Sequence, residues 1–131
     1  MANVPGIADL IVYDIKNQKF VQVENFSKFP DSRPITETKY FYSYHRSGCA
    51  DMDWDSDLFY IENFKTIKIG NISGRECENT IVKDGIYIYS ITGENKKLIK
   101  TMPIGTINKY KDYKWGFIKD YWSKNYKLFE K

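Results

Sequence analysis

The sequence predicts a mainly β fold: about eight antiparallel strands in successive hairpins, followed by one amphipathic helix. Two compositional observations favour this class. Aromatic residues make up 17% of the 131 residues, and β-branched Ile outnumbers both Leu and Ala. Such residues suit a pleated, half-buried surface, whereas the scarcity of Ala disfavours helices. In addition, several short segments alternate apolar with polar residues between turn residues, which is typical of half-buried strands.

The N-terminal half contains two predicted hairpins and one strand between them. The predicted strands span residues 8–14, 19–23, 39–46, 57–62 and 65–72. The first hairpin turns at Asn17-Gln18 and the second at Asn63-Phe64. Residues 27–34 hold two Pro residues and an Asp, and therefore predict a loop. We also expect loops over residues 47–55 and 73–78, where polar residues and Gly interrupt the strand patterns.

The C-terminal half predicts a third hairpin and then the helix. Residues 80–82 and 86–90 flank Lys83-Asp84-Gly85, a strong tight-turn signal. After a turn at Thr92-Gly93-Glu94-Asn95, a strand over residues 97–102 closes the third hairpin and ends at Pro103. From Asn108 to Lys131 apolar residues recur at spacings of three and four with Lys between them, which favours an amphipathic helix over the alternative, a pair of aromatic strands.

The length is that of one domain, so residues 1–131 are predicted to form a single β-rich unit with a basic, aromatic C-terminal segment over residues 104–131. Residues 94–131 hold ten Lys against four Asp or Glu, whereas residues 1–93 hold ten Lys or Arg against 13 Asp or Glu. The segment can contact an anionic surface, or it can simply balance the acidic body. No run approaches the roughly 18 apolar residues of a membrane span.

Two cysteines, Cys49 and Cys77, are candidates for a disulfide. Closing a loop of that size would stabilise the fold by about 3–4 kcal/mol in the chain-entropy model. A disulfide favours an oxidising compartment, so we expect a periplasmic or secreted protein whose signal peptide has been removed. The alternative is a cytoplasmic protein with two free thiols, because the first six residues resemble no signal sequence.

An acidic segment follows Cys49, with Asp51, Asp53, Asp55 and Asp57 at alternate positions around Trp54. Close carboxylates repel one another unless solvent or a basic partner offsets the repulsion. We therefore expect this segment to be a recognition loop for a basic protein, with Trp54 as the buried anchor inside an acidic rim. One alternative is that the carboxylates pair with the chain's own Lys-rich C-terminal segment. The other is a solvated acidic turn with Trp54 in the core.

The same carboxylates partly match a calcium loop. Asp51, Asp53, Asp55 and Glu62 fall at positions 1, 3, 5 and 12 of an EF-hand pattern. Ser56 stands where that loop needs Gly, and no flanking helices are evident, so no metal site is predicted.

Two other residue groups suggest alternative chemistries. His45 with Cys49 and Asp51 forms the one conceivable thiol–imidazole site. A disulfide from Cys49 to Cys77 would remove the nucleophile, so we predict no enzyme and no cofactor. The C-terminal segment interleaves Lys with aromatic side chains, as in proteins that bind single-stranded nucleic acid. The members of this array are Lys109, Tyr110, Lys111, Tyr113, Lys114, Trp115, Lys119, Trp122, Lys124 and Lys127.

The stretch Ile11 to Phe20, followed by Pro30 and by Phe41 to Cys49, resembles bacterial periplasmic proteins of the FG-GAP/VCBS-like class, some of them lysozyme-inhibitor-like. The resemblance covers residues 8–70. It implies a propeller-like or sandwich-like β fold, a secreted location and a binding role.

Together these patterns predict a non-enzymatic protein-binding module. Its most concrete form is an inhibitor or immunity protein that occludes a basic active site of a bacterial enzyme or toxin. The partner-binding residues would be Asp51, Asp53, Trp54, Asp55 and Asp57, braced by a disulfide between Cys49 and Cys77. The alternative is a single-stranded nucleic-acid-binding protein that uses the C-terminal segment.

Overall fold

The computed structural model describes residues 9–49, 52–77 and 82–131. Within these ranges the chain forms nine strands. Strands β1 (Ile11–Asp14) and β2 (Lys19–Gln22) pair with each other in a separate antiparallel hairpin. The other strands are β3 (Arg33–Pro34), β4 (Tyr40–Tyr42), β5 (His45–Gly48), β6 (Asp53–Glu62), β7 (Lys65–Arg75), β8 (Gly85–Thr92) and β9 (Asn95–Met102). These seven make one antiparallel sheet.

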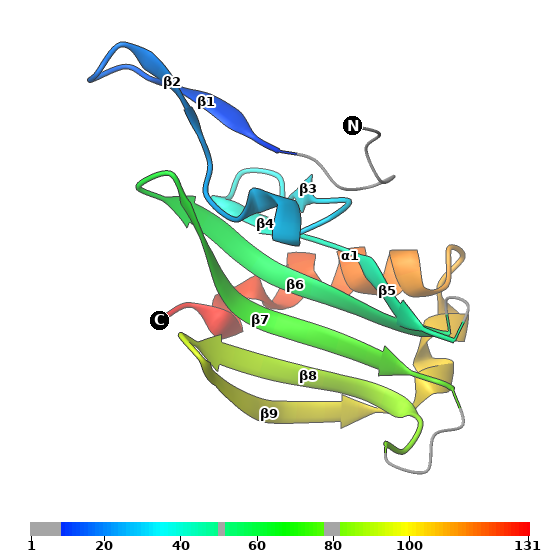
Figure 1. Ribbon diagram of the computed structural model, residues 1–131. Coiled ribbons are helices and arrows are strands. Elements are labelled where there is room, and N and C mark those ends of the chain that lie inside the picture. The colour runs from blue at the N-terminus through cyan, green and yellow to red at the C-terminus, as the bar shows by residue number, and fades with distance from the viewer. Residues whose placement is uncertain (1–8, 50–51, 78–81) are drawn as a thin grey trace.

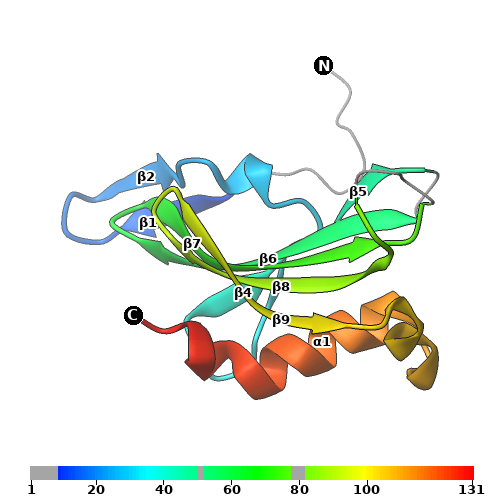
Figure 2. The same ribbon diagram turned by 90° about the horizontal axis from the view of Figure 1, so that it is seen from below.

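The strand order of the large sheet is β3-β4-β6-β7-β8-β9, and β5 also pairs with β6 (Figure 1). The described residues form one α-helix, α1 (Lys114–Asn125), and three short 3-10 turns, which span Phe26–Lys28, Ile104–Lys109 and Tyr126–Phe129. The helix lies against one face of the sheet and the β1–β2 hairpin lies over the other (Figure 2).

The mainly β fold with a C-terminal helix is therefore confirmed. The layers differ from those that the family resemblance implied, because the described residues build neither propeller blades nor two large stacked sheets. They build one open sheet with α1 on one side, since the buried aromatic face of α1 supplies the second layer that an amphipathic sheet requires.

The main core lies between the sheet and α1. The helix buries four side chains, Phe117, Ile118, Tyr121 and Trp122, at the three- and four-residue spacings of one helix face. Two glycines of β7 make room for this layer. A Cβ at Gly70 would lie 2.9 Å from the Phe129 ring, and one at Gly74 would overlap the indole of Trp54.

The opposite face carries a smaller apolar cluster beneath the hairpin. Phe59 is fully buried and stacks on Phe29 with ring centroids 4.1 Å apart. Phe41 lies on the other side of Phe59, at 5.5 Å. The pairing of β6 with β7 shifts between Leu58 and Phe59, because Ile69 of β7 is an extra residue that forms a β-bulge.

The chain after β2 fixes the base of the hairpin to the turn between β6 and β7. Glu24 forms a parallel bridge with Lys65, and its backbone N–H donates to the Phe64 carbonyl at 2.8 Å. Val23, which is nearly fully buried, closes the hairpin with a bond from its N–H to the Leu10 carbonyl. The far end of the hairpin projects away from the sheet (Figure 1).

Strand placement confirms the three predicted hairpins, the third of which joins β8 to β9 through a turn at Gly93. The tight turn predicted at Lys83-Asp84-Gly85 is wrong, because β7 ends at Arg75 and Gly85 already begins β8. Two predicted loops are also corrected. Strand β6 already begins at Asp53, inside the loop predicted over residues 47–55. Strand β7 runs on to Arg75, inside the loop predicted over residues 73–78. Both segments are strands because their polar side chains bond to each other across the sheet. The prediction for residues 80–81 lies outside the described residues.

Candidate functional site

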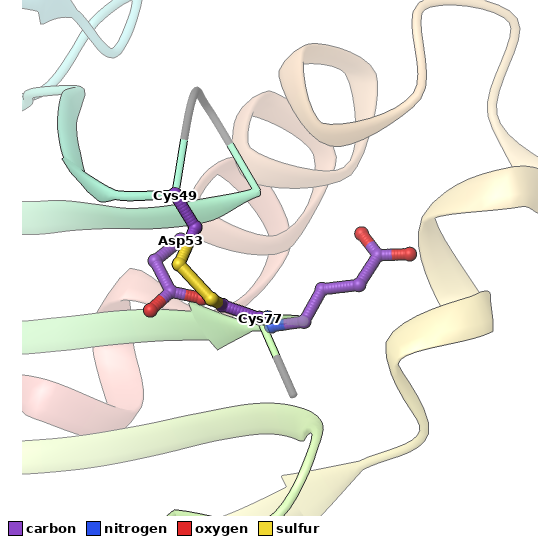
Figure 3. The surroundings of a disulfide bond; sticks show 4 residues. Cys49, Asp53 and Cys77 are labelled. Atoms are coloured by element: carbon purple, nitrogen blue, oxygen red, sulfur yellow. A yellow bond between two sulfur atoms is a disulfide. The ribbon is translucent and has the colours of Figure 1, made fainter. Parts of the chain in front are cut away.

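The predicted disulfide is present between Cys49 and Cys77, whose Cα atoms are 5.9 Å apart. It joins the turn after β5 to the end of β7 (Figure 3). Asp53 lies beside it, and its Oδ1 accepts hydrogen bonds from the N–H groups of Glu76 and Cys77 at 3.0 and 3.2 Å. The Asp53 carboxylate therefore supports the disulfide from within the chain. Asp51, which was predicted with it, lies outside the described residues.

Trp54 lies on the helix face of β6, not in a recognition loop. Only 1% of its surface is exposed, and its indole packs against Gly74 and the ring of Phe117. A partner cannot reach this side chain while the helix is in place. The prediction of Trp54 as a partner-binding anchor is thus corrected, and the alternative that placed it in the core is the one observed.

Asp55 and Asp57 project from the other face of β6 into a buried polar network. The strand register sets Asp55 opposite Ser73 and Asp57 opposite Asn71. Ser73 donates to Asp55 Oδ1 at 2.6 Å, and the Asn71 side-chain amide donates to Asp57 Oδ1 at 2.9 Å. The two carboxylates are held apart by these donors, which reduces the repulsion that their spacing would cause in isolation.

Basic side chains close the network from both sides. The Arg75 guanidinium donates to Asp55 Oδ2 at 3.0 Å, and Ser47 of β5 donates to the same oxygen. Lys68 Nζ lies 3.3 Å from Asp57 Oδ1. The charges of Asp55 and Asp57, which were predicted to face a basic partner, are therefore paired within the chain, and Asp57 is only 3% exposed.

Burial and the polar contacts of Asp55 shift its pKa in opposite directions. Burial by itself raises the pKa of the carboxyl group, because the charged form loses hydration. Hydrogen bonds from Ser47 and Ser73, together with the Arg75 guanidinium, outweigh burial and hold the pKa below its ordinary value. Asp55 is thus a carboxylate at neutral pH and serves as the centre of the network.

The thiol–imidazole alternative lacks a free thiol at this site. Cys49 is in the disulfide, and both cysteines are accounted for by that bond. His45 lies on β5 opposite Asp55, with Nε2 4.0 Å from Asp55 Oδ2. Its Nδ1 is buried and has no hydrogen-bond partner among the described residues.

The calcium-loop pattern does not assemble into a cluster either. Asp55 faces Ser73 and Arg75, whereas Glu62 lies at the far end of β6, seven residues away along an extended strand. Among residues 9–49, 52–77 and 82–131, no group of three or more His, Cys, Asp or Glu is placed to hold a metal ion.

The C-terminal array divides between core and surface. Trp122 is fully buried and donates its indole N–H to Ser56 at 2.9 Å, so it cannot stack on a nucleic-acid base. Tyr113 and Trp115 remain exposed. Lys124 pairs with Asp120 one helical turn earlier, at 2.8 Å. In the part of the chain that the structure describes, no helix is both long and apolar enough to cross a membrane.

One apolar surface was missed by the sequence interpretation. Ile11, Tyr13, Ile15 and Phe20, which we call the hairpin face, are each at least half exposed. Tyr13 and Phe20 are directly opposite each other in the β1–β2 register, with ring centroids 5.1 Å apart. The only signal in the sequence was that apolar residues occupy both alternating sets of positions in residues 10–15.

Comparisons of the chain with protein-family models, with curated proteins and with solved structures found no match. Any function must therefore be inferred from the geometry of the chain itself.

Proposed function

We propose that this chain is a non-enzymatic protein-binding module that docks onto its partner through the hairpin face. One observation carries the proposal: side chains of Ile11, Tyr13, Ile15 and Phe20 are exposed by 61%, 50%, 82% and 74% on a single short hairpin. Large exposed apolar patches mark interaction sites on proteins that otherwise keep such residues apart.

The strand register supports an interface rather than an ordinary solvated face. The inner face of the hairpin places Val12 opposite Val21 and ends in the buried Val23. Antiparallel strands with one packed face normally turn polar residues to solvent on the other. Here the outer positions carry Ile11, Tyr13 and Phe20 instead, and these are more exposed than the half-buried Val12 and Val21 of the inner face.

Contacts within the hairpin also fix its exposed side chains and its turn, which favours docking. The Tyr13 and Phe20 rings meet edge to face at 72°, an arrangement that fixes two large side chains in place. Asp14 accepts hydrogen bonds from the side chain and backbone of Asn17 and so stabilises the turn. Rigid aromatic side chains lose little conformational entropy on binding, which suits them to act as anchors.

A protein partner fits this surface better than a nucleic acid. Residues 9–24 hold two Lys against three Asp or Glu, whereas nucleic-acid sites depend on an excess of cations. The inhibitor or immunity role remains the concrete form of the proposal, with occlusion of an enzyme or toxin by the hairpin face. The disulfide supports a periplasmic or secreted location, where such bonds persist.

Site-specific photocrosslinking in the cell of origin tests the proposal. A photoreactive phenylalanine analogue at Phe20 should give one discrete adduct with a different protein. The matched control places the analogue at Leu128, which is 68% exposed on the helix side and outside the hairpin face. Tyr13→Ser with Ile11→Ser should remove the Phe20 adduct while leaving the thermal unfolding midpoint nearly unchanged.

Two outcomes would contradict the proposal. An adduct of twice the chain mass would show that the hairpin face joins two copies. Equal adducts from positions 20 and 128, or none from either, would show that the hairpin face has no partner of its own.

A further inference from the structure

A pocket of about 370 Å³ lies on the helix side of the sheet, where the β3–β4 edge meets the start of α1. Its volume falls within the range of small-molecule sites. Tyr42 and Tyr44 contribute from the strand side, and Trp115 and Ile118 from the helix. The pocket is separate from the hairpin face and from the Asp55 network.

Aromatic rings form the apolar part of this pocket. Tyr42 and Tyr44 are less than 10% exposed, so their rings are fixed by the fold. The Trp115 ring lies against Tyr44, with centroids 3.9 Å apart and planes inclined by 51°. Trp115 itself is 48% exposed although it is large and apolar. Trp115 therefore supplies most of the exposed aromatic surface, which the buried rings hold in place and which a flat or branched hydrocarbon group can cover.

Charged side chains of both signs line the same pocket. Asp31 and Arg33 come from the strand wall, and Asp112 and Lys119 come from the helix wall. Within the described residues, none of these four side chains forms an ion pair or a side-chain hydrogen bond. This contrasts with the Asp55 network, where each charge has a partner inside the chain.

The lining thus offers two carboxylates, two cations and an aromatic surface, with a formal charge that sums to zero. A ligand that satisfies all of these groups carries one positive charge, one negative charge and an apolar body. A nucleotide supplies the flat ring but brings only anionic charge, which Asp31 and Asp112 disfavour. A purely apolar ligand would leave the four charges without partners.

We propose that this pocket binds a small zwitterion with an aromatic or large aliphatic body, that is, an α-amino acid, free or within a short peptide. The ammonium group is held by Asp31 and Asp112, and the carboxylate by Arg33 and Lys119. The side chain packs on Tyr44 and Trp115. No covalent step is involved, and the site is independent of the hairpin face.

Isothermal titration calorimetry with L-phenylalanine on the full chain tests this directly. We expect saturable binding with one site. N-acetyl-L-phenylalanine lacks the ammonium charge and L-phenylalaninamide lacks the carboxylate, so each should bind about tenfold more weakly, as loss of a charge-assisted contact predicts. The dipeptide L-Phe-L-Phe distinguishes a free amino acid from a short peptide as the ligand. If it binds more tightly than L-phenylalanine, the pocket is a peptide site. If it binds more weakly, the pocket is a site for the free amino acid.

Variants connect the affinity to the named charges. Arg33→Gln with Lys119→Gln should bind L-phenylalanine and L-phenylalaninamide equally, because the carboxylate then has no partner. Asp31→Asn with Asp112→Asn should remove the preference over N-acetyl-L-phenylalanine in the same way. Asp84→Asn and Lys127→Gln, which change exposed charges outside the pocket, are the matched controls and should leave both preferences intact.

Three results would overturn the proposal. The first is the absence of saturable binding of L-phenylalanine and L-Phe-L-Phe up to about 10 mM, near the weak limit for ligands of this size. The second is tighter binding of adenosine monophosphate than of both, which would assign an anionic ring ligand. The third is binding whose preferences survive both double variants, which would place the ligand elsewhere on the chain.

Discussion

The two faces of strand β6 are held in place by different interactions, although their side chains alternate along one segment of the chain. Towards α1 the strand presents Trp54, Ser56 and Leu58, each at most 1% exposed. Towards the other side it presents Asp53, Asp55 and Asp57. One face packs against aromatic rings, and the other is held by hydrogen bonds and ion pairs to β7.

This contrast shows how the register of the sheet is specified. A shift of one residue would turn Asp55 towards Trp122 and Trp54 towards the polar side, because strand side chains alternate between faces. The apolar face supplies most of the burial free energy, which is not directional. The polar face specifies the register, because Asp55 lies opposite Ser73 and Asp57 lies opposite Asn71 at one register only.

The largest expected effect comes from the helix face. Trp54→Ala should lower the free energy of unfolding by about 3–5 kcal/mol, because it removes a fully buried ring and leaves a cavity beside Gly74 and Phe117. Urea unfolding followed by circular dichroism measures it. Trp115→Ala, which removes a half-exposed ring, is the matched control and should cost well under half as much. Equal costs would show that the helix face is not the main core.

The next effect tests the disulfide at the end of the polar face. Cys49→Ser with Cys77→Ser should lower the free energy of unfolding by about 2–4 kcal/mol, the usual range for a loop of this size. Mass spectrometry of the denatured wild type without reductant should give a mass lower by two hydrogen atoms than with reductant. If wild type unfolds at the same urea concentration with and without reductant, the bond does not stabilise the fold.

Asp55→Ala tests the polar network itself. It leaves Arg75 without its carboxylate partner and removes the acceptor of the Ser47 hydroxyl, whereas Ser73 keeps Asn71 Oδ1 as an acceptor at 2.7 Å. Because Arg75 remains about one quarter exposed, we expect a loss of about 2–3 kcal/mol, below the 3–5 kcal/mol typical of fully buried pairs. Asp84→Ala, at an exposed site, should cost under about 0.5 kcal/mol. A loss no larger than that of Asp84→Ala would show that the network adds no stability.

The same residue should impose a pH dependence. The folded pKa of Asp55 is lowered, so its contribution is present above the unfolded value of about 3.9 and is lost as pH falls through the lower folded value. Asp55→Asn should therefore flatten the acid side of the stability profile relative to wild type. An unchanged acid profile would place the controlling carboxylate elsewhere.

Sequence reasoning located the hairpins and the helix but missed the polar half of β6. Alternating apolar residues and tight turns are local signals, and they sufficed for the three hairpins and for α1. Asp is disfavoured in strands, so the segment from Asp53 to Asp55 resembled a loop. What makes this segment a strand is the set of partners on β7, Asn71, Ser73 and Arg75, which lie 14 to 20 residues away in the sequence.

The candidate surfaces were less accessible to sequence reasoning than the fold. Ile11 to Tyr13 has the same composition as a core strand, and only the three-dimensional structure shows that one of its faces is uncovered. The pocket joins residues from β3 and β4 to residues of α1, about 80 positions apart. By contrast, the disulfide was predictable because only two cysteines are present.

The smallest expected effect concerns the hydrogen bond that links β4 to the C-terminus on the helix face. Burial and the hydrogen bond donated to Glu130 raise the pKa of Tyr40 to about 12. The unfolded tyrosine ionises near pH 10, so the stabilisation is complete below that pH and is lost as pH rises through about 12. Tyr40→Phe should cost about 1 kcal/mol at pH 7, the value of one hydrogen bond, and should reduce the loss of stability above pH 10.

The comparison is with Tyr13→Phe on the exposed hairpin face, which should leave the alkaline profile unchanged. Identical alkaline profiles for the two variants would show that the contact between Tyr40 and Glu130 does not hold the C-terminus to β4.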